Sequence, residues 1–117
     1  MTPTTSDVQR FLPLKPQDLH ILTVLVRANA HGYGIMRTVE DETDGRVRLE
    51  VGSLYRLLGR LLDQGLIEEV APPDDETDTR RRHYGITALG RNVARAETRR
   101  LADFVASPGV RALLEEG

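Results

Sequence analysis

One segment shows the clearest separation of apolar and polar positions in the chain. Its leucines fall at i, i+3, i+4, i+7 and i+8, the spacing of one helix face: Leu54, Leu57, Leu58, Leu61 and Leu62. We expect the Ser53 hydroxyl to cap this helix and Gly65 to end it in the left-handed conformation. Tyr55, Arg56 and Arg60 lie on the opposite face, so the pattern predicts that they point into solvent.

Three further segments have helical spacing. The first begins at Pro16 and is apolar on more than one side, which predicts a helix at the centre of the core. The second spans residues 33–43, with Gly45 as a left-handed terminator. The third follows Thr87, whose hydroxyl is expected to cap it, and spans residues 88–106.

Shorter segments predict strands. Residues 46–51 alternate arginine with apolar residues, which indicates a very short strand, and residues 66–71 and 81–87 flank an exposed loop. The last two segments predict a β-hairpin with a long tip. The order of elements is that of a winged helix-turn-helix, in which one helix enters the DNA major groove beside a hairpin, the wing. The predicted fold is therefore mainly α with a small β-hairpin.

Length and composition predict the number of domains, the absence of disulfides and the cellular location of the protein. A chain of 117 residues can bury one core, so we expect a single domain. The absence of cysteine excludes disulfides and thiolate zinc sites, and it fits a reducing compartment. The N-terminus lacks the pattern of a signal peptide, and no apolar run is long enough to cross a bilayer. These features predict a cytoplasmic protein with no membrane partner.

Charge is unevenly distributed although the formal net charge is only -2. Residues 63–78 contain seven acidic residues and no basic one, whereas residues 79–100 contain seven arginines and one glutamate. Three of these arginines, Arg80, Arg81 and Arg82, lie where the wing would meet DNA phosphates. The acidic residues at the wing tip would be repelled by phosphate, so we expect the tip to point away from DNA or to be disordered, which leaves the arginine side of the hairpin as the contact.

The exposed face of the leucine-rich helix suits a nucleic acid. Arginine can donate two hydrogen bonds to guanine, and tyrosine can contact phosphate, sugar or base edges. An arginine-rich helix or a triple arginine alone is typical of an ordinary solvated surface. Their coincidence favours DNA binding through Tyr55, Arg56 and Arg60 in the groove and Arg80–Arg82 on the backbone, with Ser53 as a further phosphate donor.

No catalytic or metal-binding motif is present in the sequence. The three histidines, His20, His31 and His83, are far apart along the chain, and neither an H-E-x-x-H motif nor a glycine-rich phosphate loop occurs. The acidic segment 74–78 lacks the glycine and the glutamate that a calcium-binding loop needs at its later positions. We predict a protein that is not an enzyme, with no cofactor and no metal.

The chain resembles the PadR family of bacterial transcriptional regulators over about residues 14–106. The resemblance rests on "HGY" at 31–33, "GSLY" at 52–55, "QGLI" at 64–67 and the wing ending "RHYGITALG" at 82–90. It implies a homodimer, formed through the last helix, that binds a pseudo-palindromic operator in double-stranded DNA. It also implies a regulator that represses transcription and responds to a small apolar effector.

Apolar residues on the last helix agree with an implied dimer interface. They form two stripes, and the expected interface comprises Leu89, Val93, Ala96, Leu101, Phe104 and Val105. The alternative is that this helix packs only on its own core. The predicted division is a flexible arm over residues 1–12, a winged helix-turn-helix domain over 13–87, and a dimerisation helix with a tail over 88–117.

One alternative function stays open at this point. The same scaffold could be a protein-interaction module that does not bind DNA, because an acidic partner protein would also suit an arginine-rich face. DNA binding would weaken steeply with salt and show sequence preference, which distinguishes the two.

Overall fold

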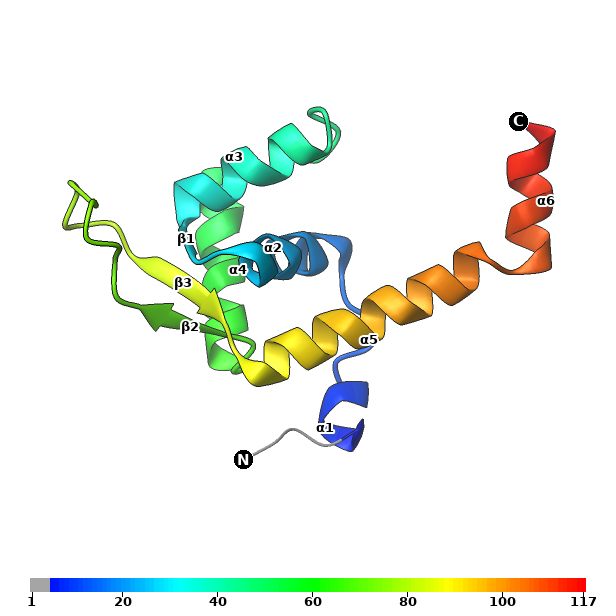
Figure 1. Cartoon of the computed structure of the whole chain (residues 1–117), viewed down its shortest axis with the longest axis horizontal. Coiled ribbons are helices and arrows are strands. Elements are labelled where there is room, and N and C mark those ends of the chain that lie inside the picture. Colours follow the sequence, from blue (N-terminus) through cyan, green and yellow to red (C-terminus); the bar gives the residue numbers. More distant parts are fainter. Residues whose placement is uncertain (1–4) are drawn as a thin grey trace.

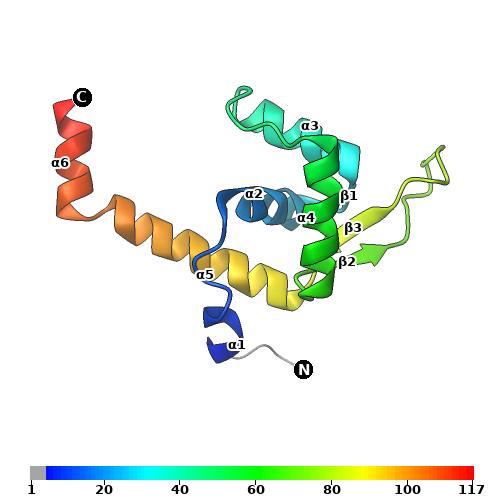
Figure 2. The same ribbon diagram turned by 180° about the vertical axis from the view of Figure 1, so that it is seen from behind.

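The structure is a computed structural model that describes residues 5–117 and consists of helices with a small sheet at one side (Figures 1 and 2). The helices of the described part are α1 Thr5–Gln9, α2 Pro16–Arg27, α3 Gly32–Glu42, α4 Val51–Asp63, α5 Ala88–Val105 and α6 Pro108–Glu116. The strands are β1 Ala30–His31, β2 Ile67–Val70 and β3 His83–Ile86. A mainly α fold with a β-hairpin, as the sequence predicts, is confirmed.

The core forms where α2 packs between its neighbours. α2 contacts α3, α5 and β3, and its side chains Ile21 and Leu22 are fully buried. Helix α4 contributes Leu54, Leu57, Leu58 and Leu61, which are all buried. The expected central position of the helix that begins at Pro16 is confirmed, because its apolar residues meet partners on several sides.

The connection between α3 and α4 differs from the expectation. Asp44 and Gly45 adopt positive φ angles of 52° and 77°, as a left-handed helix terminator requires. The strand expected at residues 46–51 is absent: residues 46–50 are irregular and Val51 already begins α4. The backbone N–H of Val47 donates to the Thr43 hydroxyl (3.0 Å) instead of to a neighbouring strand.

The sheet is antiparallel, with the strand order β1-β3-β2. β2 and β3 form the predicted hairpin, in which Ile67 pairs with Ile86 and Val70 with His83. β1 is an additional strand, in which His31 is the register partner of His83. A two-residue strand is too short for its periodicity to be detected in the sequence.

The start of α5 is tied to the end of α4. The Thr87 hydroxyl accepts from the Gly90 N–H (3.0 Å), which confirms the expected cap, and it donates to the Gly65 carbonyl (2.6 Å). The Thr87 N–H donates to the Leu66 carbonyl (3.1 Å). These bonds fix the angle between α4 and α5 and so the position of the wing between them.

Part of the N-terminal arm is helical. Residues 5–9 form α1, which contacts α5 and buries Val8, and Phe11 and Leu12 pack against the same core. The expectation of a flexible arm over residues 1–12 therefore does not hold for this part, because its apolar side chains cover α5. The expectation for residues 1–4 lies outside the described residues.

The second half of α5 leaves the domain. Figure 1 shows α5 running from the sheet past α2 to a separate α6, and the molecule extends 51 Å along its longest axis. The exposed large apolar side chains of this region are Leu101, Phe104, Val105, Leu113 and Leu114. Within the described residues, no helix combines the length and the apolar character needed to cross a bilayer.

The predicted dimer interface is divided by this arrangement. Val93 is fully buried in the core, so its assignment to the interface is wrong. Leu89 and Ala96 are half-buried and pack against the same core. Of the six, only Leu101, Phe104 and Val105 are exposed, because the buried residues of α5 lie in its first part, which packs on α1 and α2.

Candidate nucleic-acid interface

Helix α4 divides its side chains as the sequence pattern predicts. Its leucines face the core, whereas Tyr55 is 54% exposed and Arg56 is also exposed. Ser53 is not the cap, because the helix begins two residues earlier and Glu50 occupies the N-cap position. Ser53 lies in the first turn, and its hydroxyl is 3.5 Å from Nη2 of Arg56. The two residues therefore lie next to each other on the exposed face.

Arg60 has a different place from the one expected. Its Nη2 lies 2.5 Å from Oδ1 of Asp18, a residue in the first turn of α2 that is only 6% exposed. A buried carboxylate needs a charged or hydrogen-bonding partner, so this ion pair joins α4 to α2. Arg60 is thus engaged within the domain and is not free on the groove-facing side, which sequence spacing alone did not reveal.

Tyr55 lies against the start of α3. A Cβ atom placed on Gly32 would be 3.1 Å from the Tyr55 hydroxyl oxygen, so the absence of a side chain at Gly32 allows this approach. The tyrosine is therefore supported on one side by backbone and exposed on the other. The "HGY" and "GSLY" segments of the sequence meet at this contact.

A hollow of about 560 Å³ opens beside Tyr55, between α3, α4 and the wing. It is lined by His31, Gly32, Tyr33, Tyr55, Asp78, Arg80, Arg81, Arg82 and Tyr84. Three guanidinium groups and the tyrosines supply hydrogen-bond donors and positive charge, the features that phosphate oxygens require. The structure thus brings the three wing arginines and Tyr55 to one surface.

Tyr33 and Arg37 extend this surface along α3 and were not expected from the sequence. Nη1 of Arg37 donates to the Tyr33 hydroxyl (3.0 Å), and its guanidinium carbon lies 5.8 Å from the ring centre. Tyr33 is 51% exposed. Their i, i+4 spacing on the predicted second helix was a usable signal, because such pairs share a helix face.

The wing tip folds toward its own arginines. Oδ1 of Asp78 accepts from the backbone N–H (3.0 Å) and from Nε (3.3 Å) of Arg80, and these bonds hold the pKa of Asp78 below its usual value. Arg81 lies 3.9 Å from both Asp78 and Glu76. Asp78 and Glu76 are therefore paired within the wing, because side chains bond to nearby backbone in this loop, and the expectation that the tip points away from DNA stays a prediction.

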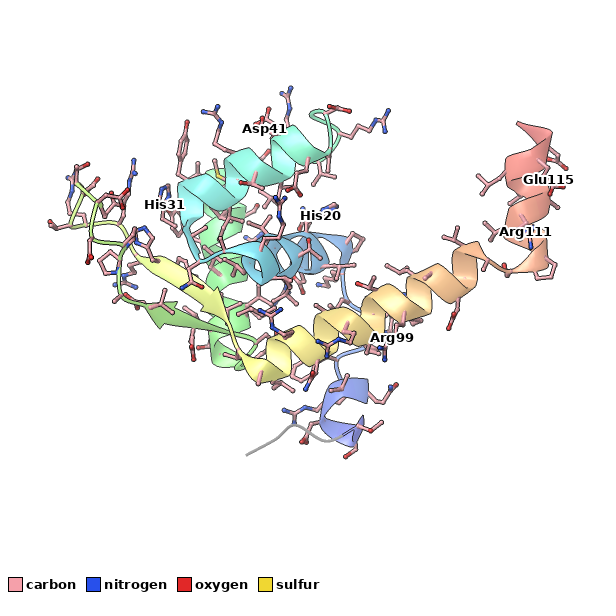
Figure 3. The ribbon with its side chains drawn as sticks, in the orientation of Figure 1. His20, His31, Asp41, Arg99, Arg111 and Glu115 are labelled. Carbon is pink, nitrogen blue, oxygen red and sulfur yellow. The ribbon has the colours of Figure 1, made fainter. Side chains whose placement is uncertain are left out.

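His31 is the N-cap of α3. Its Nδ1 accepts from the Gly34 N–H (3.0 Å), and its Nε2 lies 3.3 Å from Nη1 of Arg81. Burial, Arg81 and His83 lower the pKa of His31, while Glu76 acts in the opposite direction. The imidazole is therefore held in the neutral form that an accepting Nδ1 requires. Figure 3 shows His31 at the start of α3, next to the wing.

Comparisons with known proteins agree with this architecture. Residues 21–96 match the Transcriptional regulator PadR-like family. RosR of H. salinarum is 29% identical, with a TM-score of 0.64 and 91% of each chain covered. A PadR family transcription regulator from Clostridium difficile is 22% identical, with a TM-score of 0.65, and the alignment covers 74% of this chain and 88% of that one.

A third solved structure contains DNA. Bacillus subtilis PadR in complex with operator DNA is 21% identical, with a TM-score of 0.58, and 81% of this chain and 49% of that chain are covered. A search of the curated proteins found no match. The family match spans more than half of the chain and confirms the resemblance identified in the sequence. The protein therefore belongs to the PadR-like family and is a transcriptional regulator with a winged-helix DNA-binding fold.

Proposed function

We propose that this regulator represses transcription by binding a pseudo-palindromic operator as a homodimer. The main support for this proposal is that Tyr55 of α4 and the three wing arginines line one hollow. Arg56, which follows Tyr55 in the sequence, is also exposed. In this proposal the exposed face of α4 enters the major groove, and Arg80–Arg82 contact the backbone. The operator DNA in the B. subtilis PadR complex supports the proposal through a shared fold.

Base recognition is assigned to Arg56. Replacing Arg56 by alanine is expected to weaken binding to the selected operator by about 1–3 kcal/mol and to change binding to random DNA little, because a bidentate contact to guanine discriminates among bases. Fluorescence anisotropy with both duplexes measures the difference. Equal losses on the two duplexes would assign Arg56 to a phosphate instead.

Backbone contact is assigned to the wing. Arg82 is exposed, so its replacement by alanine is expected to weaken binding evenly across sequences and to reduce the slope of log K against log salt by about 1. Affinities over a series of salt concentrations give the slope. Arg111→Ala on α6, far from the wing in Figure 3, is the matched control, and an unchanged slope for Arg82→Ala would remove this residue from the interface.

The dimer is assigned to the exposed half of α5. Phe104 and Val105 are 62% and 50% exposed, and a second copy of this helix would cover them. A Phe104→Asp/Val105→Asp chain is expected to be monomeric in light scattering and to bind a two-half-site operator far more weakly than a dimer does. Asp103→Asn, a neighbouring exposed change, is the control. A persistent dimer would place the interface elsewhere.

The proposal includes a small apolar effector. A groove of about 430 Å³ next to the exposed half of α5 is lined by Leu14, Pro16, Leu19, His20, Thr23, Glu97, Arg100 and Leu101. A ligand there would lie beside the proposed dimer contact. Its binding could thereby change the separation of the two α4 helices, which must match half-sites roughly 34 Å apart.

A protein-interaction role predicts a different result. Selection of genomic fragments with the purified protein, followed by footprinting, tests the proposal directly. Retention of fragments that share a palindromic motif supports the repressor. Failure to retain any fragment at modest ionic strength would favour an acidic partner protein. Binding of such a partner is expected to weaken with salt, but it involves no preference for a DNA sequence.

A further inference from the structure

Two histidines and one glutamate meet outside the α4 face, at the junction of α3 and the wing. His31 ends β1, Glu76 lies in the wing loop and His83 begins β3; one ligand atom from each lies within 4.8 Å of the others. The register pairs His31 directly with His83, and their rings are 5.3 Å apart in an edge-to-face arrangement. We expected no metal site because the histidines are far apart along the chain. The strand register brings two of them together in space.

Two buried polar atoms of the cluster make no hydrogen bond, although Oε1 of Glu76 faces Nε2 of His83 at 3.3 Å. His83 is 5% exposed and the Glu76 side chain 9%, yet Oε1 of Glu76 and Nδ1 of His83 make no hydrogen bond to any described residue. Oε2 of Glu76 accepts from the backbone N–H groups of Thr77 (2.9 Å) and Asp78 (3.3 Å), which aims Oε1 at the histidines. Buried polar atoms are normally paired, so this arrangement needs an explanation.

One distance in the cluster already suits a transition metal ion, and the other ligand atoms, all within 4.8 Å of one another, would move closer on binding. Oε1 of Glu76 and Nε2 of His83 are 3.3 Å apart, close to the edge of a tetrahedron whose metal–ligand bonds are about 2.0–2.2 Å. Imidazole nitrogen and carboxylate oxygen are common ligands of Zn²⁺. We propose that His31, Glu76 and His83 bind one Zn²⁺ ion, through Nε2 of each histidine and Oε1 of the glutamate, with water as the fourth ligand.

Arg81 occupies the cluster in the structure as it stands. Its Nη1 lies 3.3 Å from Nε2 of His31 and 3.9 Å from Oε1 of Glu76. A divalent cation between the same atoms would repel the guanidinium, and the Arg81 side chain, which is 44% exposed, would turn outward. Metal binding would thus free Arg81 for a phosphate. This consequence rests on the proposed DNA-binding function, whereas metal binding itself does not.

Coordination also changes the cap of α3. Nδ1 of His31 now accepts from the Gly34 N–H, so its proton is on Nε2. A metal bound to Nε2 moves the remaining ring proton to Nδ1, and the bond from Gly34 is lost. The amide resonance of Gly34 is therefore a specific reporter of an ion at this site.

The first test uses Zn²⁺ and the full chain, freed of metal by a chelator and titrated by calorimetry. We expect one ion per chain with micromolar or tighter affinity, and a Gly34 amide shift in a ¹⁵N spectrum. His83→Ala is expected to weaken binding roughly tenfold or more. His20→Ala, which changes the one remaining histidine and lies on α2 in Figure 3, should bind as the unaltered chain does.

A second variant is needed because His83→Ala could lose Zn²⁺ binding simply by failing to fold. His31→Asn removes one ligand and retains a residue that caps helices well, so its circular dichroism and melting should remain native. Lost Zn²⁺ binding in this folded variant supports the site. No stoichiometric binding by the unaltered chain, or binding undiminished in both His83→Ala and His31→Asn, would overturn it.

A separate measurement tests the release of Arg81. DNA affinity is expected to rise when Zn²⁺ is added and to return to its starting value with a chelator, and Arg81→Ala should abolish this difference. Stoichiometric Zn²⁺ binding without any change in DNA affinity would refute the release alone. If the chain binds no DNA under any condition, the proposed function fails, and the calorimetric result still decides the metal site.

Discussion

Replacing Arg60 by alanine is expected to lower the free energy of unfolding by about 3 kcal/mol, measured by urea denaturation. The substitution leaves the buried carboxylate of Asp18 without its partner (Nη2 to Oδ1, 2.5 Å). The effect should lie at the lower end of the range for a broken buried ion pair, because the Arg60 side chain is itself 36% exposed and water can enter the vacated space. Any loss of DNA binding in this variant would then accompany loss of fold.

Arg56→Ala is the matched control on the same helix. Arg56 is exposed, so its removal should change the unfolding free energy by no more than about 0.5 kcal/mol. A double change, Asp18→Asn with Arg60→Ala, should recover part of the lost stability because it removes the unpaired charge. If Arg60→Ala and Arg56→Ala had equal unfolding free energies, the Asp18–Arg60 pair would contribute nothing to the stability of the fold.

Replacing Gly90 by alanine should cost about 3 kcal/mol or more, because the first turn of α5 packs directly on backbone. A Cβ atom at this position would overlap the Leu66 carbonyl oxygen, and that oxygen already accepts from the Thr87 N–H. The carbonyl cannot move aside without breaking this bond. The melting temperature should fall steeply, and α5 should shift relative to α4.

Gly59 provides the opposite case. It lies inside α4, where an added Cβ atom would meet no described neighbour within 4 Å, so Gly59→Ala should raise the unfolding free energy by about 1 kcal/mol through helix propensity alone. Both variants replace glycine by alanine, but the free energy of unfolding is expected to fall in one and to rise in the other. Stabilisation by both would show that α5 and Leu66 are less tightly packed than the structure indicates.

Local patterns were sufficient for most elements. The leucine spacing of α4, the cap at Thr87 and the positive φ angles of Gly45 and Gly65 depend on neighbours within a few residues, and the structure confirms them. The segment 46–51 shows where such patterns are insufficient. Alternation alone does not make a strand, because a strand also needs a partner for its backbone hydrogen bonds.

The candidate site was predictable only in outline. An exposed Tyr55 and Arg56 and a group of wing arginines follow from helix periodicity and charge. The pairing of Arg60 with Asp18 joins residues 42 positions apart in sequence, and no local signal marks it. The support of Tyr55 by Gly32 likewise depends on how α3 and α4 pack.

The sequence by itself determined that α2 to α5 are helical, which face of each is apolar, and to which family the chain belongs, since these follow from residue order over short distances; α1, expected to be part of a flexible arm, was not found this way. Tertiary structure decided which charged groups are engaged and which remain free: Arg60 is paired with Asp18 of α2, Val93 lies in the core, and His31 meets His83 across β1 and β3. The physical reason is that burial, ion pairing and strand register depend on contacts between distant segments, and periodicity carries no information about them.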